Sequence, residues 1–337
     1  MLNDIRNLIE CNRSLSLFYD SICQNRIYRS LINKKVEKRI LYLAKNKKYK
    51  FMIETASICN AKCSFCIYQS SSRAKIIMSD DTFNLIVKRI KDEKITPTIF
   101  DLFLLGEPLI DPNLFKRITT LKNNFPESSV RITSNFALAS PEIIEQIFSS
   151  GLDGINISLN AASSDSYKKI MGIDYDTTVQ NINALIDMKN KKQSRLEIQI
   201  SFVLCKENYK ESNKFRRLWK YKVNSLRFQR MHEWSGRKLI GSDSKYSTNK
   251  YLYPCNDLFE RIPILSNGDY SLCCADSTGL TDININATPI LDAFSSSAYN
   301  NLRQIHLNGK INNCSMCNKC MGVNSNGANW LFAPGER

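Results

Sequence analysis

The sequence has no apolar run that approaches the roughly 18 residues needed to cross a bilayer. Its N-terminus also lacks the basic stretch and apolar core of a secretory signal. These two absences argue against a transmembrane segment and against secretion, so we expect a cytoplasmic protein. Histidine is scarce as well, with only His232 and His306 among 337 residues. Side chains that could act as a general acid or base near neutral pH are therefore few.

The net charge of +15 is concentrated near the N-terminus, because residues 26–50 hold ten Lys/Arg and one Glu (10 − 1 = +9). Within this stretch Ile32, Val36, Ile40 and Leu43 recur at helical spacing, which predicts an amphipathic helix with a basic outer face. Such a face is either simply solvated or attracts a phosphorylated substrate, an acidic partner or an anionic membrane surface. No recognition motif accompanies the charge, so no nucleic-acid partner is expected.

Cysteine is abundant, with 12 residues, and it is clustered. Metal-ligand spacings in a long chain without a secretory signal indicate intracellular metal sites rather than disulfides. Cys59, Cys63 and Cys66 lie in an expected loop just after the apolar run 51–55. Three thiolates can hold three irons of a cubane and leave the fourth iron open to a small molecule, whereas four thiolates close the cluster.

From about residue 49 to residue 230, apolar strand patterns alternate with amphipathic helix patterns. This alternation predicts parallel strands joined by right-handed crossovers. Six such units predict an α/β fold, a partial (β/α)6 TIM-like barrel with its site at the carboxyl ends of the strands. The expected strands are 51–55, 99–105, 129–133, 155–159, 196–204 and 225–229, and the expected helices are 79–94, 111–124, 141–150, 176–192 and 207–220.

The spacing of the three cysteines, C-x3-C-x2-C with the aromatic Phe65 before the last one, resembles the signature of the radical SAM superfamily. The resemblance implies that Cys59, Cys63 and Cys66 hold a 4Fe-4S cluster whose open iron binds S-adenosyl-L-methionine (SAM). It also implies reductive cleavage of SAM to a 5′-deoxyadenosyl radical, which abstracts a hydrogen atom from a substrate. Such chemistry needs a low-potential electron donor of the flavodoxin or ferredoxin type.

Short motifs at other expected strand ends extend this resemblance. Residues 105–108, Leu-Gly-Glu-Pro, resemble the family's GGEP motif, in which a glycine lets the backbone approach SAM and a carboxylate accepts from its ammonium group. Met171 stands where the family often has an arginine that pairs with the SAM carboxylate, so Lys168 and Lys169 are candidates for that role. The residues that the resemblance places against SAM are Phe65, Gly106, Glu107, Pro108, Ser134, Asn135, Ser158 and Asn160.

A second cysteine set follows a polar stretch, 235–250, whose composition is typical of a linker. Asn267-Gly268 between two apolar runs predicts a hairpin that brings Cys273 near Cys255, and a helix is expected over 290–308. Four thiolates at such spacings fit either a zinc ion or an iron–sulfur cluster. The candidate ligands are Cys255, Cys273, Cys314, Cys317 and Cys320, with Cys274 as an alternative to Cys273 and Cys320 as an alternative to Cys317.

Behind a radical SAM core, this second set resembles the SPASM/twitch extension, whose C-x12-G-x4-C opening it matches. Full SPASM domains continue with further cysteines, whereas nothing of the kind follows Cys320, so we expect one auxiliary 4Fe-4S cluster. The expected divisions are a basic helical extension (1–48), the radical SAM core (49–234), the linker (235–250), the auxiliary cluster domain (251–325) and a tail (326–337).

The resemblance implies an oxidoreductase-like enzyme in which the auxiliary cluster helps to oxidise a sugar, a cyclitol or a carrier-linked small molecule. One alternative is a SPASM-type maturase that forms thioether or C–C crosslinks, or formylglycine, in a peptide or protein. Two further alternatives are an epimerase, with Cys205 returning a hydrogen atom, and a zinc-containing binding protein. His232, just past the sixth expected strand, is the candidate for deprotonating a substrate hydroxyl.

Overall fold

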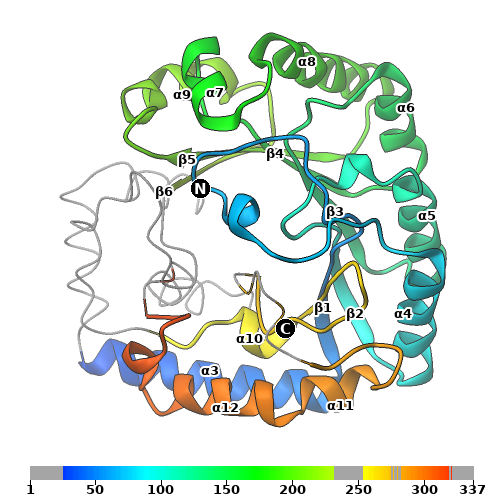
Figure 1. Ribbon diagram of the computed structural model, residues 1–337, viewed down its shortest axis with the longest axis vertical. Helices are drawn as coiled ribbons and strands as arrows, with labels where there is room; N and C mark the ends of the chain where they lie inside the picture. The colour runs from blue at the N-terminus through cyan, green and yellow to red at the C-terminus, as the bar shows by residue number, and fades with distance from the viewer. Residues whose placement is uncertain are drawn as a thin grey trace.

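The computed structural model describes residues 26–230 and 253–320, apart from 275, 277, 278, 280, 281 and 319. At its centre is an open sheet of seven strands, all parallel, in the order β6-β5-β4-β3-β2-β1-β7. Helices line the outer side of the curved sheet (Figure 1). The expected α/β partial barrel is therefore confirmed. The strands are β1 (Lys48–Ile53), β2 (Thr96–Asp101), β3 (Ser129–Ser134), β4 (Gly154–Ser158), β5 (Glu197–Leu204), β6 (Ser225–Arg230) and β7 (Arg261–Ile264).

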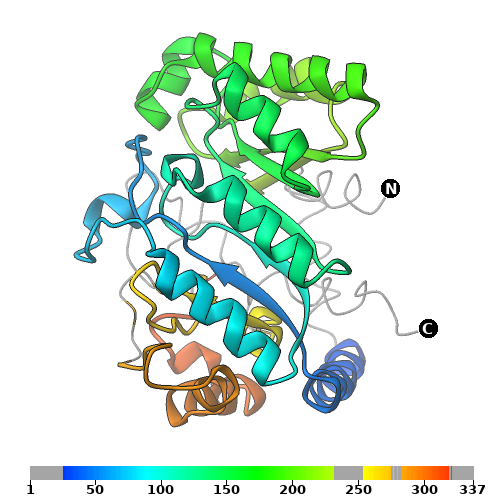
Figure 2. The ribbon, with the colours of Figure 1, turned by 90° about the vertical axis from the view of Figure 1, so that its right-hand side faces the viewer.

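Alternation along the strands gives the sheet an apolar outer face and a more polar inner face. In β4, for example, Ile155 and Ile157 are buried in the core, whereas Asn156 and Ser158 are only partly buried. Helices α4, α5 and α6 lie in a row over the outer face (Figure 2). The helices of the barrel are α4 (Asp80–Asp92), α5 (Leu114–Asn124), α6 (Pro141–Ser149), α7 (Ser164–Met171), α8 (Tyr175–Lys192) and α9 (Ser212–Trp219).

Side-chain caps explain where several of these helices begin. The hydroxyls of Ser79 and Ser140 accept backbone N–H groups in the first turns of α4 and α6, as N-cap residues do. The helix expected from residue 111 begins only at Leu114, because the Asp111 carboxylate accepts the N–H of Asn113 and forms a turn first. Helix existence was therefore easier to predict than helix limits.

Other elements also differ from what the sequence predicts. The second strand was expected to reach residue 105 but ends at Asp101, whose carboxylate forms an ion pair with Arg261, and residues 102–105 leave the sheet as a loop. The helix expected over 290–308 is two helices, α11 (Ile290–Phe294) and α12 (Ser297–Leu307). They are separated by a pair of serines, a residue type that favours helix ends over interiors. Helix α7 has no counterpart among the expected helices.

The seventh strand comes from the cysteine-rich C-terminal region. β7 pairs in parallel with β1, so that this region begins at the edge of the barrel sheet rather than apart from it. The expected hairpin is present beyond β7, with an antiparallel bridge between Ile264 and Tyr270. Gly268 in its turn has a φ of +87°, a conformation that glycine adopts without strain. The Asn-Gly signal thus located the turn correctly, but the partner of the strand before it was missed.

The basic helix α3 (Arg26–Asn46) confirms the predicted amphipathic pattern, because Ile32, Val36 and Leu43 are buried. It contacts the short helix α10 (Asp257–Glu260), which also contacts α12. Among the described residues, no helix is long and apolar enough to cross a membrane. Residues 1–25, His232, the expected linker 235–250 and the expected tail 326–337 lie outside the described residues.

Candidate active site

The cysteine loop follows β1 at the carboxyl end of the sheet and rests on the C-terminal end of α7. The N–H of Lys62 donates to the carbonyl of Met171 (2.9 Å), and the N–H of Ser64 donates to that of Ile170 (2.8 Å). Gly172 ends α7 with a φ of +69°, and a Cβ there would lie 3.1 Å from the Cβ of Lys62. Glycine at this helix end therefore allows the loop to approach closely.

Each of the three thiols in this loop has a defined neighbour. Cys59 Sγ accepts the N–H of Ala61, and Cys66 Sγ accepts the N–H of Tyr68, both at 3.4 Å. Cys63 Sγ lies 3.4 Å from the thioether sulfur of Met171. Backbone N–H groups directed at sulfur favour the thiolate form, which is the form that binds metals.

The electrostatics of the loop fit an iron–sulfur cluster. Burial raises the pKa of Cys59 to about 11 and also raises the pKa of Cys63 and Cys66, and the thiolates of Cys59 and Cys66 raise that of Cys63 further. Three thiolates in one partly buried loop need a positive centre, which a metal cluster supplies. Among the described residues, no three metal-binding side chains converge as for a single ion, whereas a cubane accepts one thiolate at each of several irons.

The Gly-Glu-Pro turn lies directly against the cysteine loop. A Cβ on Gly106 would lie 1.9 Å from the carbonyl oxygen of Ala56, so no other residue fits there without movement of the backbone. The buried Glu107 carboxylate accepts from Ser134 Oγ (2.6 Å) and from the N–H groups of Asn135 (2.7 Å) and Leu109 (3.2 Å). Burial raises the pKa of Glu107 to about 7, although these three donors oppose the shift.

Asn135 connects the turn to the cysteines. Its amide nitrogen donates to Asn60 Oδ1 (2.8 Å), and the same side chain hydrogen-bonds to Cys59, which lowers the pKa of that thiol against the larger effect of burial. The predicted cofactor residues Gly106, Glu107, Pro108, Ser134 and Asn135 are thus brought together beside the cysteine loop, where each remains a predicted SAM contact.

The other predicted cofactor residues are placed differently. Asn160 is buried, with its amide oxygen accepting the N–H of Val203 (2.7 Å) and its amide nitrogen donating to Met171 Sδ (3.1 Å). Its side chain therefore already has partners within the protein. Ser158 is partly buried on the inner face of β4, and Phe65 packs partly buried against the core. These three assignments stay predictions.

Two residues that contact the cysteine loop or belong to it, Tyr68 and Asn60, were not predicted from the sequence. The N–H of Cys59 donates to the Tyr68 hydroxyl (3.0 Å), and the Lys75 ammonium lies 3.7 Å from the centre of the Tyr68 ring. Asn60, the residue after Cys59, is the partner of Asn135. A tyrosine two residues beyond the last cysteine of a motif gives no signal by itself, because its role depends on how the loop folds back.

The thiols of the second cysteine set lie in one region of the fold. Burial raises the pKa of Cys255, and the neighbouring thiolates of Cys320 and Cys273 raise it further. The pKa of Cys274 is raised in the same way, first by burial and then by the nearby Asp257, Cys320 and Cys255. Cys317 donates to Cys314 and lies close to Cys273 and Cys320 as well. The hairpin and the C-terminal knuckle thus bring six thiols into one neighbourhood, although no three of these described thiols converge as for a single metal ion, and Cys273 and Cys274 remain alternatives.

The candidate acid–base and hydrogen-donor residues are less informative. Cys205 follows β5 at the rim, as expected, and burial together with the nearby Glu207 carboxylate raises its pKa to about 12. His306 lies on α12, where Nδ1 accepts the N–H of Cys255 (3.1 Å) and burial lowers its pKa to about 4. A neutral, buried imidazole that accepts a backbone N–H has a packing role. His232 lies outside the described residues.

Comparison with known families settles the class of protein. Residues 53–218 match the family model of the radical SAM superfamily. The chain belongs to the radical SAM superfamily. Residues 255–321 of this radical SAM enzyme match a second model, that of the SPASM iron–sulfur cluster-binding domain. The enzyme therefore uses SAM, a 4Fe-4S cluster that binds SAM, and an auxiliary cluster.

Curated relatives match this radical SAM enzyme over part of its length. It is 29% identical over 163 residues to a probable GTP 3′,8-cyclase of Saccharolobus solfataricus, which is 47% of this chain and 48% of the relative. A probable GTP 3′,8-cyclase of Saccharolobus islandicus is 28% identical over 168 residues, 48% of this chain and 50% of the relative. The chain thus spans about half the length of the curated relatives it matches.

Solved structures match the radical SAM enzyme over a larger share of the chain. Native anSMEcpe with bound AdoMet has a TM-score of 0.60 at 15% identity and covers 84% of this chain and 96% of its own. BtrN in complex with AdoMet and 2-DOIA has a TM-score of 0.55 at 13% identity, over 80% of this chain and 91% of its own. SuiB of Streptococcus suis has a TM-score of 0.59 at 16% identity, and the match covers 80% of this chain and 71% of the SuiB chain. At such identities the likeness shows a shared fold.

Proposed function

We propose that Cys59, Cys63 and Cys66 bind the SAM-binding cluster. The observation that carries this assignment is the grouping of three partly buried thiols, two of them accepting backbone N–H groups, in the loop that follows β1. The fourth iron of such a cluster has no cysteine from this loop and is therefore open to SAM. Bound there, SAM supplies a 5′-deoxyadenosyl radical that abstracts hydrogen from the substrate.

The residues around the loop position SAM and exclude water. Glu107 keeps an acceptor site on Oε2, because a carboxylate has about four lone-pair sites and three donors occupy the rest. That oxygen can accept from the SAM ammonium group, and Gly106 gives the backbone room for close approach. Met171 occupies the position of the family's arginine, and its side chain is buried against Cys63 and Asn160. Lys168 and Lys169 stay candidates for the SAM carboxylate.

We further assign the auxiliary cluster to Cys255, Cys273, Cys314, Cys317 and Cys320, of which four are used, with Cys274 as the alternative to Cys273. Their mutual proximity supports this assignment, since each described thiol of the set lies near at least one other. Asp257 and Arg261 flank Cys274, so charged groups adjoin the site. An auxiliary cluster next to the radical site can accept the second electron of a substrate oxidation.

The substrate proposed is a sugar, a cyclitol or a carrier-linked small molecule, which the enzyme oxidises. Polar side chains on the inner face of the sheet support this choice, because Thr133, Asn156 and Gln199 suit a hydroxylated molecule better than an apolar one. The curated relatives are named for a small-molecule substrate, GTP, and the BtrN structure holds the small molecule 2-DOIA. The net charge of +15 favours a substrate with phosphate groups.

A second candidate function is peptide maturation. It is favoured by the structural likeness to SuiB bound to the precursor peptide SuiA (TM-score 0.54) and to anSMEcpe with AdoMet and Cp18Cys peptide (TM-score 0.59). A peptide would lie across the same open end of the barrel, where the strand ends and the cysteine loop meet.

Deuterium transfer separates the two candidates. Anaerobically reconstituted enzyme is incubated with SAM, a low-potential reductant and one C-deuterated compound, and 5′-deoxyadenosine is analysed by mass spectrometry. We expect deuterium in 5′-deoxyadenosine from deuterated cyclitols or sugar nucleotides and none from deuterated peptides of neighbouring genes. Transfer from a peptide alone would replace the oxidation with maturation. The Cys63→Ala variant serves as the control, because it is expected to yield no 5′-deoxyadenosine.

A further inference from the structure

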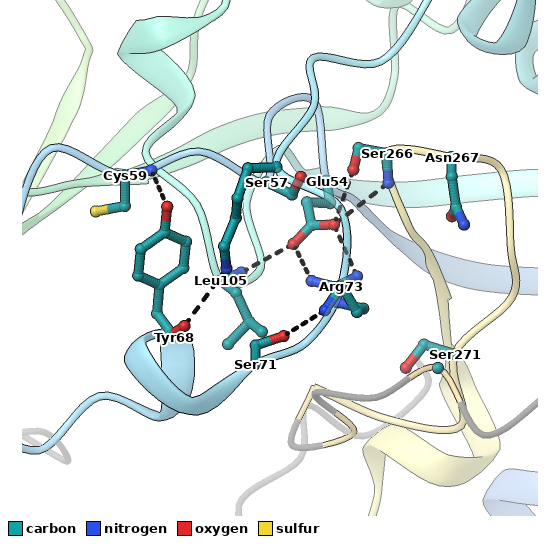
Figure 3. A network of polar contacts seen from close by, with 12 residues as sticks. Glu54, Ser57, Cys59, Tyr68, Ser71, Arg73, Leu105, Ser266, Asn267 and Ser271 are labelled. Carbon is teal, nitrogen blue, oxygen red and sulfur yellow. Dashed lines mark hydrogen bonds and ion pairs between the residues drawn. The ribbon is translucent and has the colours of Figure 1, made fainter.

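One acidic side chain at the end of β1 is fully buried and takes part in none of the chemistry assigned above. Glu54 has no exposed surface, although it directly follows the apolar residues that end the strand. Arg73 binds both of its oxygens, with Nη2 at 2.6 Å from Oε1 and Nη1 at 2.9 Å from Oε2 (Figure 3). The N–H of Leu105 donates to Oε1 (3.3 Å), and Ser266 donates to Oε2 through its N–H (3.3 Å) and its hydroxyl (3.2 Å).

These three partners come from three different loops at the same end of the sheet. Arg73 belongs to the segment that closes the cysteine loop, a few residues after the Tyr68 that accepts from Cys59 (Figure 3). Leu105 immediately precedes the Gly-Glu-Pro turn. Ser266 follows β7 in the hairpin that leads to Cys273. One carboxylate therefore joins the loop of the SAM-binding cluster, the turn assigned to SAM and the hairpin of the auxiliary cluster.

The chemistry of the contact demands a carboxylate. Its two oxygens accept from five donors, which is more than the about four lone-pair sites of an ionised carboxylate, so no acceptor site is left unused. A glutamine would place N–H donors against at least one of these groups. A buried ion pair contributes little net stability compared with apolar residues of similar volume, yet a bidentate arginine–carboxylate pair fixes geometry closely. Relative placement of the three loops is therefore what this pair supplies.

We propose that Glu54 is a positioning residue that fixes the loop of the SAM-binding cluster relative to the hairpin of the auxiliary cluster. Its contacts with Arg73 and Leu105 hold the loop of the SAM-binding cluster and the Gly-Glu-Pro turn, and its contacts with Ser266 hold the hairpin of the auxiliary cluster. The proposal requires that both clusters are present, which the family shows, and it does not depend on which substrate the enzyme oxidises.

The test measures the distance between the two clusters in the reconstituted, reduced enzyme by pulsed EPR. We expect a narrow distance distribution in the wild type and a broadened one in Glu54→Gln, with iron content unchanged. SAM affinity, followed through the change in the EPR signal of the SAM-binding cluster, is expected to fall about tenfold in the same variant, the factor that 1.4 kcal/mol corresponds to. The control is Asp153→Asn, which removes a partly exposed carboxylate bound to Lys122 (2.9 Å) and to the N–H of Val130 (2.8 Å). That control is expected to change neither the distance distribution nor the affinity for SAM.

Two more variants keep the proposal falsifiable if Glu54→Gln does not fold. Ser266→Ala removes one donor on the auxiliary side without leaving a charge unpaired, and is expected to broaden the distance distribution while SAM affinity is retained. The double variant Glu54→Gln/Arg73→Met removes both charges and is expected to broaden the distribution as well. A distance distribution as narrow as that of the wild type in the variants that fold would overturn the proposal and leave Glu54 with a role in stability alone.

Discussion

Glu107 shows how one residue combines a motif with an unusual environment. Ser134, Asn135 and Leu109 donate to its carboxylate, yet burial raises its pKa to about 7. The side chain is therefore neutral in a fraction of the enzyme molecules at neutral pH, and a cationic partner shifts it toward the charged form. The SAM ammonium group is the partner that the family resemblance assigns to it.

This environment predicts that SAM binding depends on pH. Below pH 7 the Glu107 carboxyl is protonated and attracts an ammonium group poorly, and above pH 7 it is ionised. Affinity for SAM is therefore expected to rise with pH, by up to about tenfold between pH 6 and pH 8. Equilibrium binding of SAM to the reconstituted enzyme measures the rise. Glu107→Gln is expected to bind SAM more weakly and with no such rise, and an equal pH dependence in that variant would contradict the assignment.

At the residue scale, the sequence indicated best those residues whose type is demanded by chemistry. Gly106 is one of them, since a Cβ there would lie 1.9 Å from the carbonyl oxygen of Ala56, whereas the role of the cysteines as cluster ligands stays a prediction. Met171 and Tyr68 could not be predicted, because their roles arise from contacts between segments far apart in the sequence. Glu54 gave the strongest unused signal, an acidic residue at the end of an apolar strand.

At the scale of elements, α7 supports the cysteine loop and is held at both ends. Its C-terminal carbonyls accept from the loop, and at its N-terminal end the Glu211 carboxylate accepts from the N–H of Ala162 and from Ser166 Oγ, both at 2.7 Å. Loosening the start of this helix should therefore weaken the platform under the cluster. This helix was not predicted from the sequence, because its 8 residues are fewer than the window over which helical spacing is judged, although Tyr167, Ile170 and Met171 stand at that spacing.

The role of α7 predicts a selective effect of Glu211→Ala. Losing these hydrogen bonds is expected to lower the free energy of unfolding by about 2 kcal/mol. It is also expected to speed iron release to a chelator from the SAM-binding cluster by about tenfold. Asp174→Ala is the control, because Asp174 caps the neighbouring helix α8 through the N–H of Thr177 (2.7 Å). That variant should lose about 1 kcal/mol of stability. Equal iron release in both variants would argue against a platform role for α7.

For the molecule as a whole, the sheet places the two cysteine sets on neighbouring strands. β1 leads into the loop with Cys59, and β7, its parallel neighbour, leads into the hairpin with Cys273. The sequence predicted six strands of this sheet from their apolar patterns and turn residues. It could not predict the seventh, since Arg261–Ile264 has the same pattern in a hairpin as in a parallel edge strand, and only tertiary packing decides between them.

Two cysteine sets on one sheet should still bind their clusters independently, because the two sets share no ligands. Reconstituted wild-type enzyme is expected to contain about eight irons per chain, the number in two cubanes. Cys63→Ala should retain about four and lose SAM cleavage, whereas Cys255→Ala should retain about four and still cleave SAM to 5′-deoxyadenosine. Iron and sulfide analysis with anaerobic SAM cleavage measures both. About four irons and one zinc in the wild type would contradict the auxiliary cluster, and continued SAM cleavage by Cys63→Ala would contradict the assignment of the cysteine loop.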